Sequence, residues 1–183
     1  MLHWVNVRFF SAALLCLTLE ARLACAHEYI HELKLGVLSH DMPGLWSGFR
    51  REPASADINI EAQLKPSLDL LCGTLRPAAG GTLNTVGQTS HVYLDARWTY
   101  DAPSGVFVSF GLGAALHDGH TNLSDPHRKA LGTHGLFHIP AEVGYRFSAH
   151  HSVSAYFEHT SNANSQTFNE GLDRLGVRYG YTF

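Results

Sequence analysis

The sequence predicts an all-β protein, an eight-stranded antiparallel transmembrane β-barrel, and three observations support this prediction. Apolar and polar residues alternate in short segments through most of the chain. Short turns and long polar loops alternate between these segments. The last segment places Leu175, Val177, Tyr179, Tyr181 and Phe183 on one face. A period of two marks strands with one apolar and one polar face, and such an aromatic end is typical of the girdle of a membrane barrel.

Residues 1–26 are predicted to be a signal peptide, which leaves residues 27–183 as the barrel domain. Arg8 precedes an apolar run from Phe9 to Leu19, and Ala24-Cys25-Ala26 is a cleavage site of the A-x-A type. The run is shorter than the roughly 20 apolar residues of a spanning helix. We therefore expect export of a single domain to the bacterial outer membrane.

Seven segments show the alternation clearly, and an eighth is inferred. The seven cover residues 32–37, 57–64, 92–99, 106–116, 141–147, 152–158 and 173–183. The eighth is expected between Leu70 and Asn84, where Pro77 and Gly80-Gly81 predict an interruption or a bulge. Eight strands would place both ends of the domain on the same side of the membrane.

The connections predict the orientation of the barrel. Asp101–Gly105 and Ser148–His151 are tight turns, whereas residues 39–56, 117–133 and 162–172 are long and polar. Barrels of the outer membrane have short turns in the periplasm and longer loops outside. Both termini are therefore expected on the periplasmic side.

A soluble lipocalin-like cup, with its apolar face around a ligand, is the alternative fold. The polar face of the strands carries charges of both signs, which can pair inside a narrow lumen. These residues are Glu32, Lys34, Asp95, Arg97, Glu142, Arg146, Glu158, Arg174 and Arg178. The opposite face consists of aliphatic and aromatic residues, as contact with lipid requires. This division of the two faces favours the membrane barrel.

Three residues of the last two strands carry the candidate chemistry. The outward set of residues 153–157 continues by steps of two to His159 and Ser161. Residues two apart on one face are about 6.5–7 Å apart at the backbone, so an imidazole can reach a hydroxyl. Asp173 begins the outward set of the final strand, and its parity permits it to be a cross-strand neighbour of His159.

The height of these residues predicts a site near the outer surface of the membrane. The ten residues from Asp173 to Phe183 climb about 23 Å in a tilted strand, close to the apolar band of about 25 Å. Ser161 would attack an ester carbonyl after His159 accepts its proton, and Asp173 would orient the imidazole. Asn162 and Asn169, with nearby backbone amides, are the oxyanion candidates. This chemistry requires no metal and no other cofactor.

The segment His159-Thr160-Ser161-Asn162-Ala163, followed by Asn169-Glu170-Gly171-Leu172-Asp173, resembles the active-site hairpin of the PagL-type lipid A 3-O-deacylases. These are eight-stranded outer-membrane barrels. The resemblance implies removal of the acyl chain ester-linked at the 3 position of lipid A, with His159 as base and Ser161 as nucleophile. Asn162 and Asn169 match polar positions of the motif. The family pattern has Glu where Asp173 stands, and Glu170 is the alternative partner of His159. Residues 32–41 and 117–119 also resemble the family.

Two other functions compete with hydrolysis. A non-enzymatic barrel would serve adhesion or envelope integrity through its long loops, and a transferase would pass the acyl chain to an acceptor other than water. The outward His159 and Ser161 favour an enzyme over the first of these. The expected partners are lipid A or lipopolysaccharide and the lipids of the outer membrane, while a homodimer is left open.

Two further classes of ligand are disfavoured. Four histidines lie in or beside the 117–133 loop: His117, His120, His127 and His134. Together with Asp118 they match no metal-ligand spacing, so they predict a solvated loop. The 13 Lys and Arg residues against 16 Asp and Glu residues give a formal net charge of −3 without a basic stripe. Nucleic acid is therefore not an expected partner.

Overall fold

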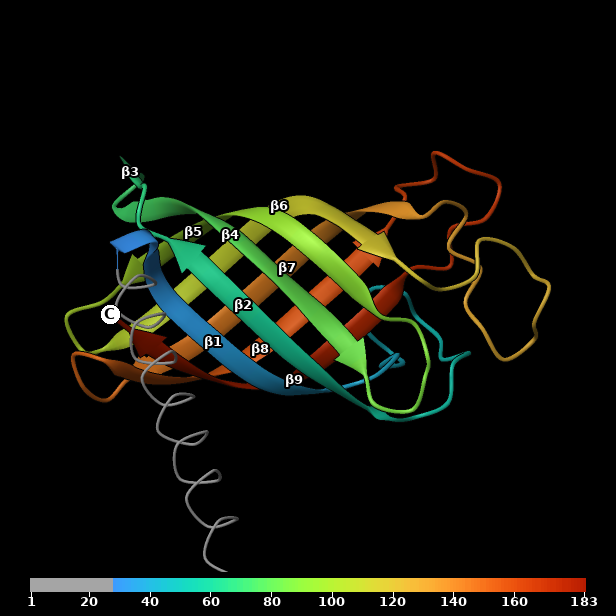
Figure 1. Cartoon of the computed structure of the whole chain (residues 1–183), viewed down its shortest axis with the longest axis horizontal. Helices are drawn as coiled ribbons and strands as arrows, with labels where there is room; N and C mark the ends of the chain where they lie inside the picture. Colours follow the sequence, from blue (N-terminus) through green and yellow to red (C-terminus); the bar gives the residue numbers. More distant parts are fainter. Residues whose placement is uncertain (1–27) are drawn as a thin grey trace, which may run out of the picture.

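The structure, a computed structural model, describes residues 28–183, and the predicted signal peptide with its cleavage site lies outside them. Nine strands follow one another along the described chain: β1 (Ile30–Ser39), β2 (Ala56–Leu64), β3 (Leu68–Leu70), β4 (Gly73–Asn84), β5 (His91–Asp101), β6 (Val106–His117), β7 (Gly135–Arg146), β8 (His151–Ser161) and β9 (Leu172–Thr182). The short β3 pairs only with β4, and the other eight form the barrel (Figure 1).

The barrel is closed and antiparallel, which confirms the predicted fold class. Its strand order is β2-β1-β9-β8-β7-β6-β5-β4, and the pairing of β2 with β4 closes the sheet. Every neighbouring pair is antiparallel. Closure removes the free strand edges that would otherwise expose unpaired backbone groups, which a bilayer cannot satisfy.

The inferred eighth strand exists as β4, but the expected interruption within it is wrong. Residues 74–82 of β4 pair with β5 without a break, and Pro77 lies opposite Ala96. On its other side the β2 ladder reaches only to Ala78, so Pro77 lies at the end of that ladder, where a missing N–H is tolerated. Gly80 is required by close packing, because a Cβ there would lie 2.5 Å from the ring of Tyr93.

The apolar face of the strands points outward and the charged face inward. Leu94 and Val177 are 69% and 66% exposed, whereas Arg97 and Lys34 are at most 1% exposed. This is the arrangement of a barrel in lipid and the reverse of a lipocalin-like cup. No helix among the described residues is long and apolar enough to cross a membrane.

A connected series of ion pairs fills the lumen. Lys34 Nζ donates to Glu142 at 2.8 Å, and Arg178 joins Glu142 to Glu61. Further pairs link Arg97 to Glu61 and Asp95, and Arg174 to Glu158 and Asp57. Each charge is compensated by a neighbour, as buried charges require. The network holds the strands of the barrel in a single register.

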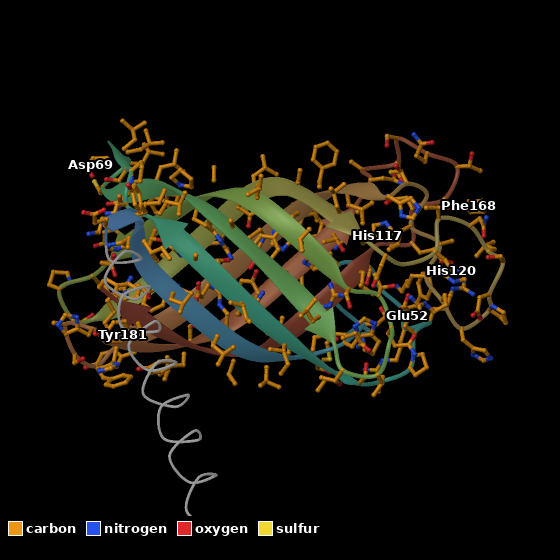
Figure 2. All side chains as sticks on the ribbon, viewed as in Figure 1. Glu52, Asp69, His117, His120, Phe168 and Tyr181 are labelled. Carbon is orange, nitrogen blue, oxygen red and sulfur yellow. The ribbon has the colours of Figure 1, made fainter. Side chains whose placement is uncertain are left out.

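The two ends of the barrel differ as predicted. Tight turns at residues 102–105 and 147–150 lie at one end, together with the C-terminus, and the long connections lie at the other (Figure 1). We name the connections at this end loop 1 (residues 40–55), loop 2 (residues 85–90), loop 3 (residues 118–134) and loop 4 (residues 162–171); loop 2 is short, and the other three are the predicted long loops. Side chains of loops 1, 3 and 4 cluster at this end, around the labelled Glu52, His120 and Phe168 (Figure 2).

Candidate active site

The pairing of β8 with β9 brings the three predicted residues together. His159 lies directly opposite Asp173 in the ladder. The Nδ1 of His159 is 2.6 Å from Asp173 Oδ1, and its Nε2 is 3.0 Å from Ser161 Oγ. Because a carboxylate only accepts, Nδ1 carries the proton and Nε2 is left to accept one from the serine. The imidazole therefore connects an acid to a hydroxyl, the arrangement that activates a serine nucleophile.

The adjacent pair in the ladder explains this register. Glu158 lies opposite Arg174, and both side chains are buried in the lumen. Arg174 Nη1 lies 3.3 Å from Glu158 Oε1 and the guanidinium also binds Asp57. A slip of one residue would expose Arg174 to lipid and turn Asp173 into the lumen. The ion pairs of the lumen thereby fix the residues on the outer face.

Loop 1 supplies two residues to this site that the sequence did not predict. Ser47 donates to Asp173 Oδ2 from its backbone N at 2.6 Å and from its Oγ at 2.9 Å. The ring of Trp46 stacks on the imidazole of His159, with centroids 4.4 Å apart and an angle of 13° between the planes. The signal in the sequence is an apolar stretch, Leu45-Trp46 and Phe49, inside a loop that otherwise reads as polar.

His159 and Ser161 are more enclosed than their outward direction suggests. They are 4% and 9% exposed, whereas Val153 on the same face of β8 is 51% exposed. Loops 1 and 4 cover the end of the strand and leave a groove of about 710 Å³ beside the two residues. The hydroxyl and imidazole are therefore partly shielded from water, although they belong to the lipid-facing side.

The groove joins this polar group to the apolar outer wall. Besides His159 and Ser161 it is lined by Leu112 of β6 and by Phe137 and Ile139 of β7. Leu112 and Phe137 are 60% and 50% exposed. Its other wall is formed by loops 1 and 4. An apolar chain extending from a bound ester can lie against these side chains without leaving the surface of the barrel.

The two oxyanion candidates lie beside Ser161 but differ in their bonding. The side chain of Asn162 is 1% exposed and its Nδ2 donates to the backbone oxygens of Leu131 and Phe168. This amide ties loop 4 to loop 3. Asn169 lines the groove, accepts from the backbone N of Asn162 at 2.9 Å and donates to Asn164 Oδ1 at 2.9 Å. The side chain of Asn169 is thus the more accessible of the two.

Ala163 and Asn164, which also line the groove, have φ values of 52° and 61°. Consecutive residues in this left-handed region are uncommon outside glycine, and such strain often accompanies functional sites.

Glu170, the alternative acid, takes part in a different contact. Its Oε2 accepts from Arg51 Nε at 2.9 Å and from the backbone N of Ala130 at 2.7 Å. These bonds link loop 4 to loops 1 and 3 and engage the carboxylate with groups other than His159. Among the two acids considered, the structure therefore places Asp173 at the imidazole.

The histidines in and beside loop 3 are held by local hydrogen bonds. His117 Nε2 lies 2.7 Å from the backbone oxygen of Thr133, and His134 Nδ1 lies 3.1 Å from that of His117. His120 Nδ1 lies 3.2 Å from Ser124 Oγ.

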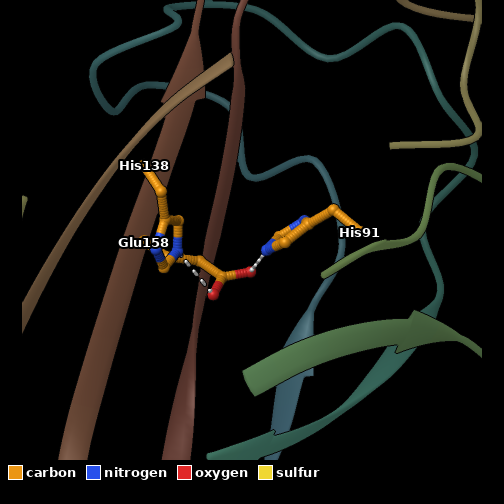
Figure 3. Close-up of side chains that lie close together, drawn as sticks. All are labelled: His91, His138 and Glu158. Carbon is orange, nitrogen blue, oxygen red and sulfur yellow. Dashed lines mark hydrogen bonds and ion pairs between the residues drawn. The ribbon is translucent and has the colours of Figure 1, made fainter. Parts of the chain in front are cut away.

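Within residues 28–183, the group whose spacing suits a metal ion lies elsewhere, in the lumen, and consists of His91, His138 and Glu158 (Figure 3). The Nδ1 of His138 is 2.9 Å from Asp95 and its Nε2 is 3.3 Å from Glu158, so both nitrogens donate. Arg174 donates to Nδ1 of His91 at 2.9 Å, which leaves the proton on Nε2. Protons thus occupy the positions that a metal would need, and the group fits a structural ion-pair network.

The fold and these surroundings define the class of the protein as a small outer-membrane β-barrel with an outward-facing polar site. The model of the family described as lipid A 3-O-deacylase (PagL) matches residues 61–182. This match includes β8, loop 4 and all of β9, together with residues 117–119, but not residues 32–41. The chain belongs to the PagL lipid A 3-O-deacylase family.

Solved structures agree with the fold. The crystal structure of the outer membrane enzyme PagL has a TM-score of 0.62 at 18% identity, covering 83% of this chain and 99% of that one. The N-terminal β-barrel domain of Pseudomonas aeruginosa OprF has a TM-score of 0.51 at 13% identity, covering 85% of this chain and 99% of that one. At these identities the likeness concerns the fold alone. No curated protein matches the chain significantly.

Proposed function

We propose that this protein hydrolyses the 3-O-linked acyl ester of lipid A, with Ser161 as nucleophile, His159 as base and Asp173 as the acid that orients the imidazole. The observation that carries the proposal is the position of His159, whose two nitrogens contact Asp173 and Ser161 at 2.6 and 3.0 Å. Family membership supplies the substrate class.

The reaction follows the order of covalent ester hydrolysis. Ser161 Oγ bonds to the acyl carbon as its proton passes to His159 Nε2. The imidazolium, stabilised by Asp173, returns that proton to the departing 3-oxygen of the sugar, and the acyl chain stays on Ser161. Water then attacks the acyl carbon with His159 as base, and the free fatty acid leaves. This sequence needs no added redox partner.

The negative oxygen of the tetrahedral intermediate needs donors on the loop 4 side of the site. We assign this role to Asn169 Nδ2 and to the backbone amides of Ala163 and Asn164, both of which have the unusual left-handed conformation. The side chain of Asn162 already serves two backbone oxygens, so its part is to hold the loop in place. Donors fixed in advance stabilise a developing charge most effectively.

The location of the site fits a substrate in the outer leaflet. His159 and Ser161 lie at the end of β8 beside the long loops, which face the exterior in barrels of this type. The groove with Leu112 and Phe137 opens on the apolar outer wall. A lipid can therefore present its ester to Ser161 while its chains remain against the barrel and in the bilayer.

Mass spectrometry of lipid A from cells that produce the protein tests this function. We expect the wild type to remove one ester-linked acyl chain and to release it as free fatty acid, and we expect Ser161→Ala to leave lipid A intact. Ser165→Ala, in the exposed part of loop 4, is the matched control and should behave as the wild type. Unchanged lipid A with a folded, inserted wild type would reject hydrolysis and favour a non-enzymatic barrel. Acyl chain found on another lipid would instead indicate a transferase.

A further inference from the structure

Loop 1 closes over the imidazole and carboxylate from outside the barrel wall. We propose that its residues Ser47 and Trp46 are positioning residues, which hold Asp173 and His159 in the reactive arrangement. The inference rests on the proposed function for the roles of Asp173 and His159. It assigns part of the catalytic geometry to a loop far from the β8–β9 hairpin in sequence.

Ser47 acts on the oxygen of Asp173 that does not face the histidine. Oδ1 accepts from His159, while Oδ2 accepts both the backbone N–H and the hydroxyl of Ser47, at 2.6 and 2.9 Å. Donors on both oxygens prevent rotation of the carboxylate about its side chain. Hydrogen bonds to a charged acceptor are the stronger kind, so Ser47 stabilises the ionised acid in the orientation that His159 needs.

Trp46 restricts the orientation of the His159 imidazole. Its indole lies almost parallel to the imidazole at 4.4 Å. Near the same ring, Gly171 approaches so closely that a Cβ there would lie 3.1 Å from His159 Cε1. Gly171 also has a φ of 63°, which disfavours any replacement with a side chain. The stacked indole and the glycine backbone together leave the imidazole little freedom to turn away from Ser161.

Backbone hydrogen bonds and two glycines with positive φ define the conformation of loop 1. The backbone N of Met42 donates to the backbone oxygen of Asp173 at 2.9 Å, which ties the loop to the start of β9. Gly44 and Gly48 have φ values of 77° and 81°, and Gly44 N bonds to Gly48 O at 3.0 Å. This tight turn contains residues 45–47 and presents Trp46 and Ser47 to the site.

The neighbouring loops hold this turn from the other side. Arg51 of loop 1 forms two hydrogen bonds with the carboxylate of Glu170 in loop 4. Lys129 of loop 3 donates to the backbone oxygen of Phe49 at 2.7 Å and lies 3.3 Å from Asp41 Oδ1. Loop 1 is thereby fixed to loops 3 and 4, and Ser47 occupies a defined position.

A double-mutant cycle on the purified full chain in detergent micelles tests the inference. The first readout is the rate at which a fluorophosphonate modifies Ser161, since attack of Oγ at phosphorus with loss of fluoride requires the activated serine but not lipid A. The second is the kcat of lipid A deacylation. The variants are Ser47→Ala, Ser47→Thr, Asp173→Ala and the double variant Ser47→Ala/Asp173→Ala, with Ser55→Ala of the same loop as control.

We expect Ser47→Ala to lower both rates about tenfold, because one hydrogen bond to a charged acceptor is lost while the backbone donor remains. Ser47→Thr keeps the hydroxyl and should restore most of the rate. In the Asp173→Ala background, Ser47→Ala should change the rates by less than about twofold, since the acceptor is gone. Ser55, whose hydroxyl accepts from Asn84 at 2.7 Å, lies away from the pair, so its variant should react as the wild type.

Trp46 is tested in the same assay. Trp46→Phe keeps a stacked ring and should retain most of the labelling rate, whereas Trp46→Ala should lower it several-fold. Because Trp46 also lines the groove, the small fluorophosphonate separates orientation of His159 from binding of the lipid.

Two results would overturn the inference. One is labelling of Ser47→Ala at the wild-type rate. The other is the same loss from Ser47→Ala with and without Asp173, which would mean that Ser47 acts through the fold of the loop. Failure of the proposed function is distinguishable: the wild type would then leave lipid A intact while its fluorophosphonate labelling still depended on Ser47.

Discussion

Two neighbouring residue pairs of the β8–β9 ladder point to opposite faces of the barrel wall. Glu158 and Arg174 face each other inside the lumen, and His159 and Asp173 face each other one position further on, outside it. Both are pairs of an acid and a base with almost completely buried side chains. The inner pair is bonded on every side to other charged groups, whereas the outer pair opens on a groove through Ser161.

The difference between the pairs lies in what remains available to a substrate. Arg174 contacts Glu158, Asp57, His91 and the backbone oxygen of Thr89, so its donors are committed to four strands or loops. His159 has one nitrogen committed to Asp173 and the other directed at the hydroxyl of Ser161, the proposed nucleophile. The inner pair fixes the register of β8 and β9, and this register places His159 opposite Asp173 in the outer pair. Substitutions in the two pairs should therefore separate stability from activity.

The largest effect is expected for His159→Ala. Removing the proposed base should lower deacylation by at least about 10⁴-fold, as for other serine hydrolases, while the denaturant midpoint for unfolding in micelles stays near that of the wild type. The kcat on purified lipid A and the unfolding curve are the measurements. A variant with substantial residual turnover would remove His159 from the mechanism.

An effect of intermediate size, on stability rather than on activity, is expected for Arg174→Met. The variant leaves Glu158 and Asp57 buried without their cation, which should cost about 3–5 kcal/mol in the free energy of unfolding. Denaturant titration of the folded barrel measures this loss. Arg50→Met, at an exposed position in loop 1, is the control and should stay within about 0.5 kcal/mol. Unchanged stability of Arg174→Met would show that the lumen pair does not fix the register.

The smallest effect is a pH dependence of loop 1. Burial opposes charge on His40, but hydrogen bonds with Asp57 and Glu52 outweigh it and raise the pKa of His40 above its usual 6.5. Burial likewise opposes charge on Glu52, yet hydrogen bonds from His40 and Thr89 lower its pKa from 4.5 to about 2. His40 therefore stabilises the loop below pH 6.5 and loses this as pH rises through its raised pKa, while the contribution of Glu52 fades below pH 4.5.

Fluorescence of Trp46 in a Trp98→Phe background measures this pH-dependent loss of loop 1 stability. We expect constant emission between about pH 4.5 and 6.5 and a change on either side, with an effect on loop stability on the order of 1 kcal/mol. His40→Gln should remove the change on the alkaline side only. Emission that titrates identically in both proteins would exclude His40 as the cause.

The sequence alone determined much of this protein, because its signals are local. Alternation with a period of two gave the strands and their faces, and the lengths of the connections distinguished the two ends. The same parity placed His159, Ser161 and Asp173 on the outer face before any contact was known. The predicted interruption at Pro77 was wrong, because a proline weakens a strand only where a neighbouring strand needs its N–H. No local pattern in the sequence shows where a ladder of strand pairing ends.

Only the tertiary structure decided which groups meet across the chain. The opposition of His159 and Asp173 depends on a register that the lumen ion pairs fix, and some of these pairs join residues more than a hundred positions apart, such as Asp57 and Arg174. Ser47 and Trp46 reach the site because loop 1 packs against loops 3 and 4. Such contacts arise from closure of the barrel and packing of its loops, and neither process leaves a periodic trace in the amino-acid sequence.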